Sequence, residues 1–178
     1  VIVRLVSPAP NVIVPLGRVP PKSAAVVGFA PLPVTAQLTL VVPRHARAFA
    51  NMPVERVAEA GGTMKAVTFA RTPPLPSYLV AFAVGEFDVR DAGTAGRNAT
   101  PISIVTPKGR SAEAAYAATA TGAILAAAER YFGMAYPFPK LDLIAYPKST
   151  FGSAMENPGL VTYTARALLA KPDEVSPL

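Results

Sequence analysis

The sequence contains no cysteine and no tryptophan among its 178 residues, and it contains a single histidine, His45. Without cysteine the chain forms neither disulfides nor thiolate metal sites, so the composition does not indicate the redox state of its compartment. A zinc site takes three or four ligands from histidine, cysteine and carboxylates. Because His45 lies between Arg44 and Arg47 in what we expect to be an exposed connection, we interpret it as a surface residue.

Several catalytic sequence motifs are missing as well. The sequence has no G-x-S-x-G elbow and neither of the glycine-rich phosphate loops, G-x-G-x-x-G and G-x-x-x-x-G-K. No pair of carboxylates is singled out for glycosidic chemistry. By these rules alone the chain is a β-rich protein without an indicated activity.

Long apolar runs are absent too. No segment approaches the roughly 18 consecutive apolar residues of a membrane-spanning helix. Residues 1–16 are apolar, but Pro8, Pro10 and Pro15 interrupt the helix that a signal peptide requires. We therefore expect a soluble protein without a membrane partner, cytoplasmic or periplasmic, with the compartment left open.

Basic residues outnumber acidic ones by 17 to 11, which gives a formal net charge of +6. They are spread singly along the chain, without a cluster and without interleaved aromatic residues. This pattern is not typical of a nucleic-acid-binding surface. We therefore expect no nucleic-acid partner.

Residues 1 to about 106 have a pattern typical of short strands. Runs rich in valine, leucine, isoleucine, phenylalanine and threonine alternate with proline and glycine, and we predict strands at residues 36–42, 64–69, 78–87 and 102–106. Leu38 and Leu40 alternate with polar residues, as in a strand with one buried face. A sandwich or layered sheet fits this pattern best.

A helix is predicted at residues 111–132. This segment is rich in alanine and lacks proline, Ser111 suits an N-cap, Glu113 lies in the first turn and Gly133 suits the C-terminal cap. The side chains expected to form its apolar stripe are Tyr116, Ile124, Leu125, Ala128, Tyr131 and Phe132. A short strand follows at residues 141–146, and residues 159–169 begin as a strand and end as a surface segment.

This change of pattern predicts two domains, with a boundary near residues 98–101. Residues 1–100 form an all-β, sandwich-like domain, and residues 101–178 begin an α/β domain. The fold class is therefore mixed.

One segment, residues 151–163, combines small residues with a lone acid, Glu156. Small residues let a ligand's backbone approach closely, and a carboxylate in such a groove suits an ammonium group. The alternative is an acid in a loop at a strand edge without a binding role.

The same segment resembles a known motif. Ser153-Ala154-Met155-Glu156-Asn157 is similar to the G-x-M-E-N exopeptidase motif of the aminopeptidase N family of zinc metallopeptidases, although Ser153 stands where that family has glycine. Further matches follow in family order, at residues 51–54, 72–73, 77–87, 131–133, 136–143 and 156–160. Residues 1–37 lack the tryptophan and acidic motif that precedes this region in the family, and their role stays open.

The resemblance implies a fold and a site. Residues 1–100 would be the latter part of the amino-terminal β domain, and residues 101–178 the beginning of the thermolysin-like peptidase domain. Glu156 would bind the free amino terminus of a peptide substrate, while Ser153, Ala154, Met155 and Asn157 would shape the groove beside it. A buried ammonium is unfavourable without a partner, so such a carboxylate favours a chain end over an internal amide.

The resemblance also implies a cofactor that this chain does not hold. The family's zinc is bound by an H-E-x-x-H helix, which we expect beyond Leu178, so we expect zinc in the full-length parent, none bound to this chain and no catalytic residue within it. The alternatives are a non-catalytic module that binds peptide termini or a partner protein, and a purely structural β module. We also expect self-association through unpaired strand edges.

Overall fold

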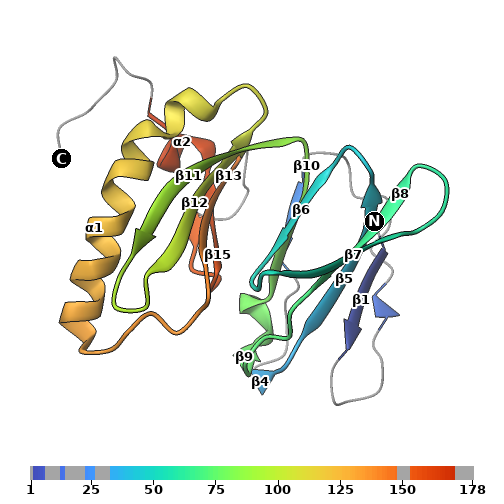
Figure 1. Ribbon diagram of the computed structural model, residues 1–178, viewed down its shortest axis with the longest axis horizontal. Helices are drawn as coiled ribbons and strands as arrows, with labels where there is room; N and C mark the ends of the chain where they lie inside the picture. Colours follow the sequence, from blue (N-terminus) through green and yellow to red (C-terminus); the bar gives the residue numbers. More distant parts are fainter. Residues whose placement is uncertain (1, 7–12, 15–22, 27–32, 148–152, 171–178) are drawn as a thin grey trace. The chain divides into compact units, whose positions relative to one another are not determined.

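The structure is a computed structural model that describes residues 2–6, 13–14, 23–26, 33–147 and 153–170. The chain divides into two compact units, Val1–Glu86 and Phe87–Leu178 (Figure 1). The predicted boundary at residues 98–101 comes later in the chain, where two strands of the second unit are joined, and as a domain boundary it stays a prediction. No helix in the described ranges is both long and apolar enough to cross a membrane.

In its described residues, the first unit consists of antiparallel strands and one short 3-10 helix. Its elements are β1 (Ile2–Val6), β2 (Ile13–Val14), β3 (Ser23–Val26), β4 (Pro33–Val34), β5 (Gln37–Pro43), β6 (Arg47–Ala50), β7 (Val54–Glu59), β8 (Met64–Phe69), β9 (Leu75–Pro76), η1 (Ser77–Leu79) and β10 (Ala81–Gly85). A five-stranded sheet has the order β2-β1-β5-β8-β7, a three-stranded sheet has the order β3-β10-β6, and β4 pairs with β9.

Side chains from the two larger sheets form one hydrophobic core. Leu38 and Leu40 of β5 are buried with Phe69 of β8 and Phe82 of β10. Along β5 the buried positions alternate with partly exposed ones, whereas every residue of β10 is buried. The predicted alternation and the sandwich-like, all-β character of this part of the chain are therefore confirmed.

The strand predicted at residues 78–87 is wrong at its start. Residues Ser77–Leu79 form η1, and β10 begins only at Ala81. The reason is the buried side chain of Asn51, which donates to the Leu79 carbonyl at 2.8 Å and accepts from the Ala81 N–H at 2.7 Å. These two bonds satisfy backbone groups on both sides of Val80, so the chain turns there without losing buried hydrogen bonds.

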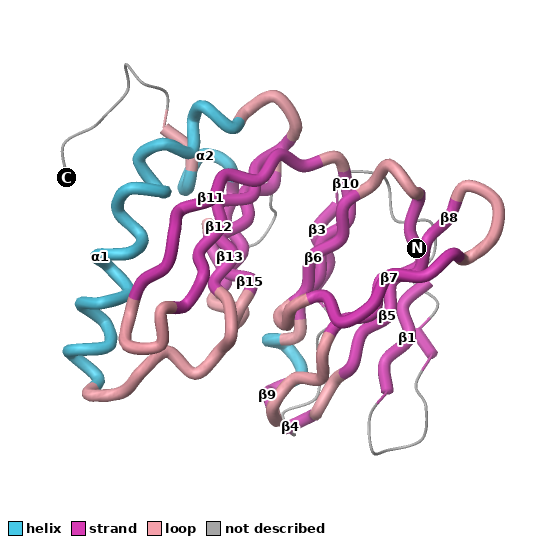
Figure 2. Tube along the Cα trace, viewed as in Figure 1, coloured by secondary structure: helices cyan, strands magenta, loops and turns pink. Residues whose placement is uncertain are grey.

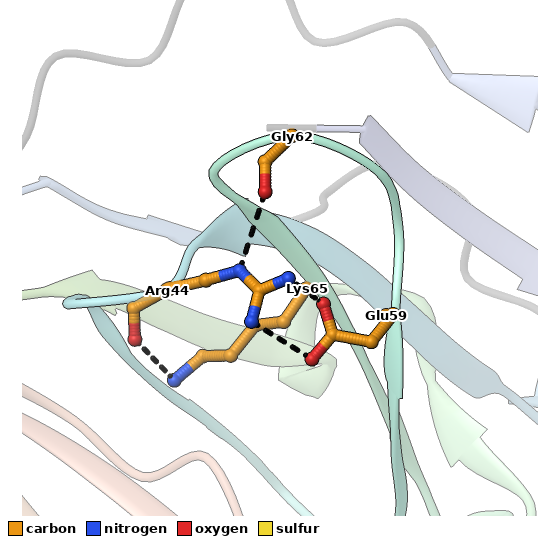
Figure 3. Close-up of polar contacts among 4 residues, drawn as sticks. All are labelled: Arg44, Glu59, Gly62 and Lys65. Carbon is orange, nitrogen blue, oxygen red and sulfur yellow. Dashed lines mark hydrogen bonds and ion pairs between the residues drawn. The ribbon is translucent and has the colours of Figure 1, made fainter.

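Three charged residues at one end of the five-stranded sheet, Arg44, Glu59 and Lys65, bind one another and the turn between β7 and β8 (Figure 3). The Arg44 guanidinium binds both carboxylate oxygens of Glu59 and also donates to the Gly62 carbonyl at 3.3 Å. Lys65 donates to the Arg44 carbonyl at 2.9 Å. Because the side chains of Arg44 and Glu59 are more than half exposed, solvent screens their attraction and the pair contributes little to stability.

The second unit is a mixed sheet with a helix on one face. Its elements are β11 (Phe87–Ala95), β12 (Thr100–Pro107), η2 (Ser111–Ala114), α1 (Ala115–Phe132), β13 (Leu141–Tyr146), β14 (Ala154–Met155), β15 (Leu160–Thr164) and α2 (Ala165–Leu168). The order is β11-β12-β13-β15-β14, with β12, β13 and β15 parallel and the two outer strands antiparallel to their neighbours. Figure 2 shows α1 beside β11 and β12, which it contacts. The predicted α/β character of this part is thus present.

The helix does not begin as predicted. Residues Ser111–Ala114 form a 3-10 turn, α1 starts at Ala115, and neither start has a side-chain cap. Arg110 pairs with Glu113 at 2.5 Å, and the Glu113 N–H donates to the Arg110 carbonyl at 3.1 Å. These two contacts tighten the first turn, so Ser111 is not the N-cap. Gly133 ends the helix with φ of 70°, as predicted.

The predicted apolar stripe of α1 is also wrong. The buried positions are Ala117, Thr121, Leu125 and Glu129, of which only Leu125 was predicted. The large side chains point outward instead, with exposed fractions of 53% for Tyr116, 65% for Ile124, 85% for Tyr131 and 70% for Phe132. Small residues on the inner face let the helix lie close to the sheet, and a Cβ added at Gly122 would stand 3.3 Å from the Cβ of Ala95.

Candidate functional site

The predicted site residues lie on and beside β14, the outer strand next to β15 in the five-stranded sheet of the second unit. Ala154 pairs with Tyr163 and Met155 with Thr162 of β15, and the Thr164 N–H donates to the Ser153 carbonyl at 2.8 Å. Within the described residues β15 is the only strand that pairs with β14. The structure therefore places Ala154 and Met155 on an edge strand, with Ser153 directly before it. Phe151 and Gly152, which precede them, lie outside the described residues.

Glu156 and Asn157 follow the strand and face in opposite directions. Glu156 is exposed, and no hydrogen bond or ion pair of its carboxylate occurs among the described residues. Asn157 is fully buried, its side-chain oxygen accepts from the Thr162 hydroxyl at 3.2 Å, and its carbonyl accepts from the Leu160 N–H at 3.1 Å. Asn157 thus anchors the turn, while its neighbour presents a carboxylate to solvent.

The turn is also held through both polar groups of the Gly159 backbone. The Gly159 N–H donates to the Tyr136 hydroxyl at 2.8 Å. The Gly159 carbonyl accepts from the Lys140 ammonium at 2.6 Å and from the Asp142 N–H at 3.1 Å. Because Gly159 has φ of 74°, which L side chains rarely adopt, glycine suits this position.

Lys140 and Asp142 form a mostly buried ion pair beside the turn. The Lys140 ammonium and an Asp142 carboxylate oxygen lie 2.7 Å apart, and the two side chains are 13% and 12% exposed. Burial lowers the pKa of Lys140, while the attraction of Asp142 opposes that shift. For the Tyr136 hydroxyl, whose charged form is an anion, burial raises the pKa. Sequence analysis cited this segment only as part of a family resemblance and missed its contacts with Gly159.

The side chain of Glu129 in α1 holds the backbone of Tyr136. Its buried carboxylate accepts from the backbone N–H groups of Tyr136 and Arg97, both at 2.7 Å. The bond from Tyr136 lowers the pKa of Glu129, burial opposes this shift, and the bond from Arg97 adds to it. At Gly96 a Cβ would lie 2.6 Å from a Glu129 oxygen, so this close approach requires glycine.

A hollow of about 250 Å³ lies beside Tyr136. It is lined by Asn98, Thr100, Pro101, Tyr136, Pro137, Phe138 and Pro139. Glu156 does not line this hollow. The groove beside Glu156, and the share of Ser153, Ala154, Met155 and Asn157 in shaping it, remain predictions, and for the buried Asn157 such a share would come from its backbone.

The described residues do not fit a zinc ion. In those parts of the chain no three histidine, cysteine, aspartate or glutamate side chains come together in a group that could hold a metal. His45 is exposed in the turn between β5 and β6. No step of a reaction is therefore assigned to a metal held by these residues.

Comparisons with known proteins find relatives of the part of the chain that holds these site residues. The family model described as the peptidase family M1 domain matches residues 116–177. The chain is 36% identical over 143 residues to an aminopeptidase N of Acetobacter pasteurianus, and this match covers 80% of the chain. It is 42% identical over 133 residues, 75% of the chain, to an aminopeptidase M1-A of Oryza sativa subsp. japonica. It is 41% identical over 143 residues, 80% of the chain, to a puromycin-sensitive aminopeptidase of Caenorhabditis elegans.

The chain belongs to the aminopeptidase N family. The family model covers Ser153 to Asn157, and thus the edge strand and the turn described above. The matches span 39% of the length of the Acetobacter relative and 15% of the length of each of the other two. What the whole family members do therefore belongs to the proposal that follows.

Proposed function

We propose that this chain supplies the amino-terminus-binding part of a zinc aminopeptidase that hydrolyses amino-terminal residues from peptides. Glu156 binds the α-ammonium group of the substrate. The observation that carries the proposal is the exposed carboxylate of Glu156 at the end of an edge strand, next to a buried residue that fixes the turn. The family membership supports the same reading.

The chemistry of the turn suits a positively charged chain end. An ammonium group donates three hydrogen bonds, and a charge-assisted bond to a carboxylate is about twice as strong as a neutral one. An acetylated or internal nitrogen carries no charge, so it would leave Glu156 without this bond. Because Glu156 is exposed, solvent screens the attraction, and the discrimination should be roughly 1.5- to 5-fold in affinity, since exposed ion pairs contribute about 0.2–1 kcal/mol.

Zinc enters the proposal only through the whole protein. In the full-length parent the metal supplies an activated water for peptide hydrolysis. Residues of this chain contribute by binding and orienting the substrate's amino terminus, and the edge of β14 adjoins the bound peptide. We propose that residues 1–178 alone bind no zinc and do not hydrolyse peptides.

Binding of a matched pair of ligands tests the role of Glu156. The protein is titrated with alanyl-alanine amide and with its N-acetyl derivative, and chemical shifts are followed by NMR. We expect tighter binding of the free amine, loss of that preference in Glu156→Gln, and an unchanged preference in Glu59→Gln, which removes another exposed glutamate. Equal binding of both ligands by the unaltered protein would refute the proposal.

A hydrolysis assay separates the enzyme from its alternative. A non-catalytic module that binds peptide termini would show the same amine preference. If the reading frame that encodes this chain continues into an H-E-x-x-H helix, we expect its full product to release aminoacyl-anilide groups and to lose this activity with a chelator. Residues 1–178 alone should show no turnover with added zinc, and turnover that disappears in Glu156→Ala would contradict that expectation.

A further inference from the structure

We infer that Tyr136 and Lys140 are positioning residues, which fix the turn that carries Glu156 and thereby set its selectivity for a free amino terminus. The inference rests on the proposed function of Glu156. It extends the site to a segment that contacts neither the carboxylate nor, as proposed, the substrate.

The first step concerns what fixes Glu156. Its side chain is exposed and finds no partner within the described residues, so packing does not determine where the carboxylate lies. Its position follows instead from the backbone between Met155 in β14 and Leu160 in β15. The start of this segment is held by strand pairing and by the buried Asn157 side chain.

The second step concerns the far end of the turn. Gly159 has both backbone polar groups bound by side chains of the segment before β13, the N–H by Tyr136 at 2.8 Å and the carbonyl by Lys140 at 2.6 Å. Tyr136 is in turn held by the Glu129 carboxylate through its own N–H. Three side chains from α1 and the following loop, together with the Asp142 N–H, therefore hold the backbone at Gly159.

The third step is that the same residues are poorly explained by stability alone. A mostly buried ion pair contributes little net stability compared with apolar residues of the same size. Lys140 and Asp142 are such a pair, yet the Lys140 ammonium also donates a second short hydrogen bond, to the Gly159 carbonyl in the turn. The placement of Lys140 therefore serves the geometry of the turn.

The structure also offers a matched control. Arg110 forms an ion pair with Glu113 at 2.5 Å within the same unit. It follows the end of β12, whereas Gly159 precedes β15, and the two strands run parallel to β13 between them. Arg110 thus lies at the opposite end of these parallel strands from the turn.

The experiment measures one ratio, the dissociation constant of N-acetyl-alanyl-alanine amide divided by that of alanyl-alanine amide, in folded protein. For Tyr136→Phe and Lys140→Met we expect the ratio to fall toward one, through weaker binding of the free amine, because a displaced carboxylate loses its bond to the ammonium group. Binding of the acetylated ligand should not change. Arg110→Met should keep the ratio of the unaltered protein.

Each outcome decides between the two proposals. If Tyr136→Phe and Lys140→Met keep the same ratio as Arg110→Met, the positioning role is refuted while the role of Glu156 stands. If the unaltered protein shows no preference for the free amine, both are refuted. Should Lys140→Met fail to fold, Tyr136→Phe decides the question, because it retains the ring beside Phe138 and removes only the hydroxyl.

Discussion

Replacing the partners of the Lys140–Asp142 ion pair singly and together should show how that pair contributes to stability. Both side chains are nearly nine-tenths buried, so each leaves an uncompensated charge when the other is removed. Lys140→Met and Asp142→Leu should therefore each lower the free energy of unfolding by about 3–5 kcal/mol.

The double variant should lose less than either single one. With both charges replaced by apolar groups, the remaining loss is the hydrogen bond from Lys140 to the Gly159 carbonyl, about 1 kcal/mol. That carbonyl keeps its bond from the Asp142 N–H at 3.1 Å, which does not depend on the side chain. The expected order of stability is thus the unaltered protein, the double variant and then the two single variants.

Urea unfolding followed by circular dichroism measures all four proteins, with the free energy taken from linear extrapolation. The control is Arg110→Met, which removes an ion pair that is more exposed on the arginine side and should cost less than about 1 kcal/mol. Losses that simply add in the double variant would refute the reasoning, because they would mean that the two charges do not compensate each other.

Three further predictions concern other contacts. The folded-state pKa of Glu129 is lowered, so the contribution of this carboxylate to stability is present above the unfolded pKa of about 4.3 and is lost as the pH falls through the folded pKa. Glu129→Gln should therefore lower the melting temperature at pH 7, and by less as the pH is lowered. A constant difference in melting temperature down to pH 2 would contradict this. Gly96→Ala should cost more than Gly109→Ala in urea unfolding, since both have positive φ but only Gly96 meets the Glu129 carboxylate, and equal losses would argue against the contact. Light scattering should show association that Val57→Lys on the edge strand β7 reduces, and a clean monomer at high concentration would count against it.

Strand positions were predictable from local sequence where the pattern was strong. The predicted strands at residues 64–69 and 141–146 coincide with β8 and β13. Both are short apolar runs bounded by turn-forming residues, and their burial follows from the same apolar side chains. Where the structure departs from the pattern, as at residues 77–79, the cause is a distant side chain, that of Asn51, which local sequence does not reveal.

The inner face of α1 shows a second reason for failure. Hydrophobicity favoured Tyr131 and Phe132 as buried residues, but a helix that approaches a sheet closely needs small side chains, and here it buries Ala117 and Thr121. Glu129 is buried on the same face because backbone N–H groups of other segments bind it. The size of the space between helix and sheet decides this choice, and sequence periodicity does not contain that information.

The candidate site was predictable only as a motif. A lone acid among small residues predicted a carboxylate in a groove that binds an ammonium group, and this stays a prediction. Glu156 is exposed, and Ala154 and Met155 before it form an edge strand of the described sheet. The contacts of Gly159 with Tyr136 and Lys140 join residues about twenty positions apart, so no local pattern predicts them.

The exposure of Glu156 next to the buried Asn157 makes this part of the chain sensitive to a change of length. One extra residue between Met155 and Glu156 would leave β14 and the Gly159 anchor in place but would displace Asn157 from the Thr162 hydroxyl that it binds. Loop grafts among relatives should therefore succeed when they conserve the residue count here and keep Asn157 and Gly159.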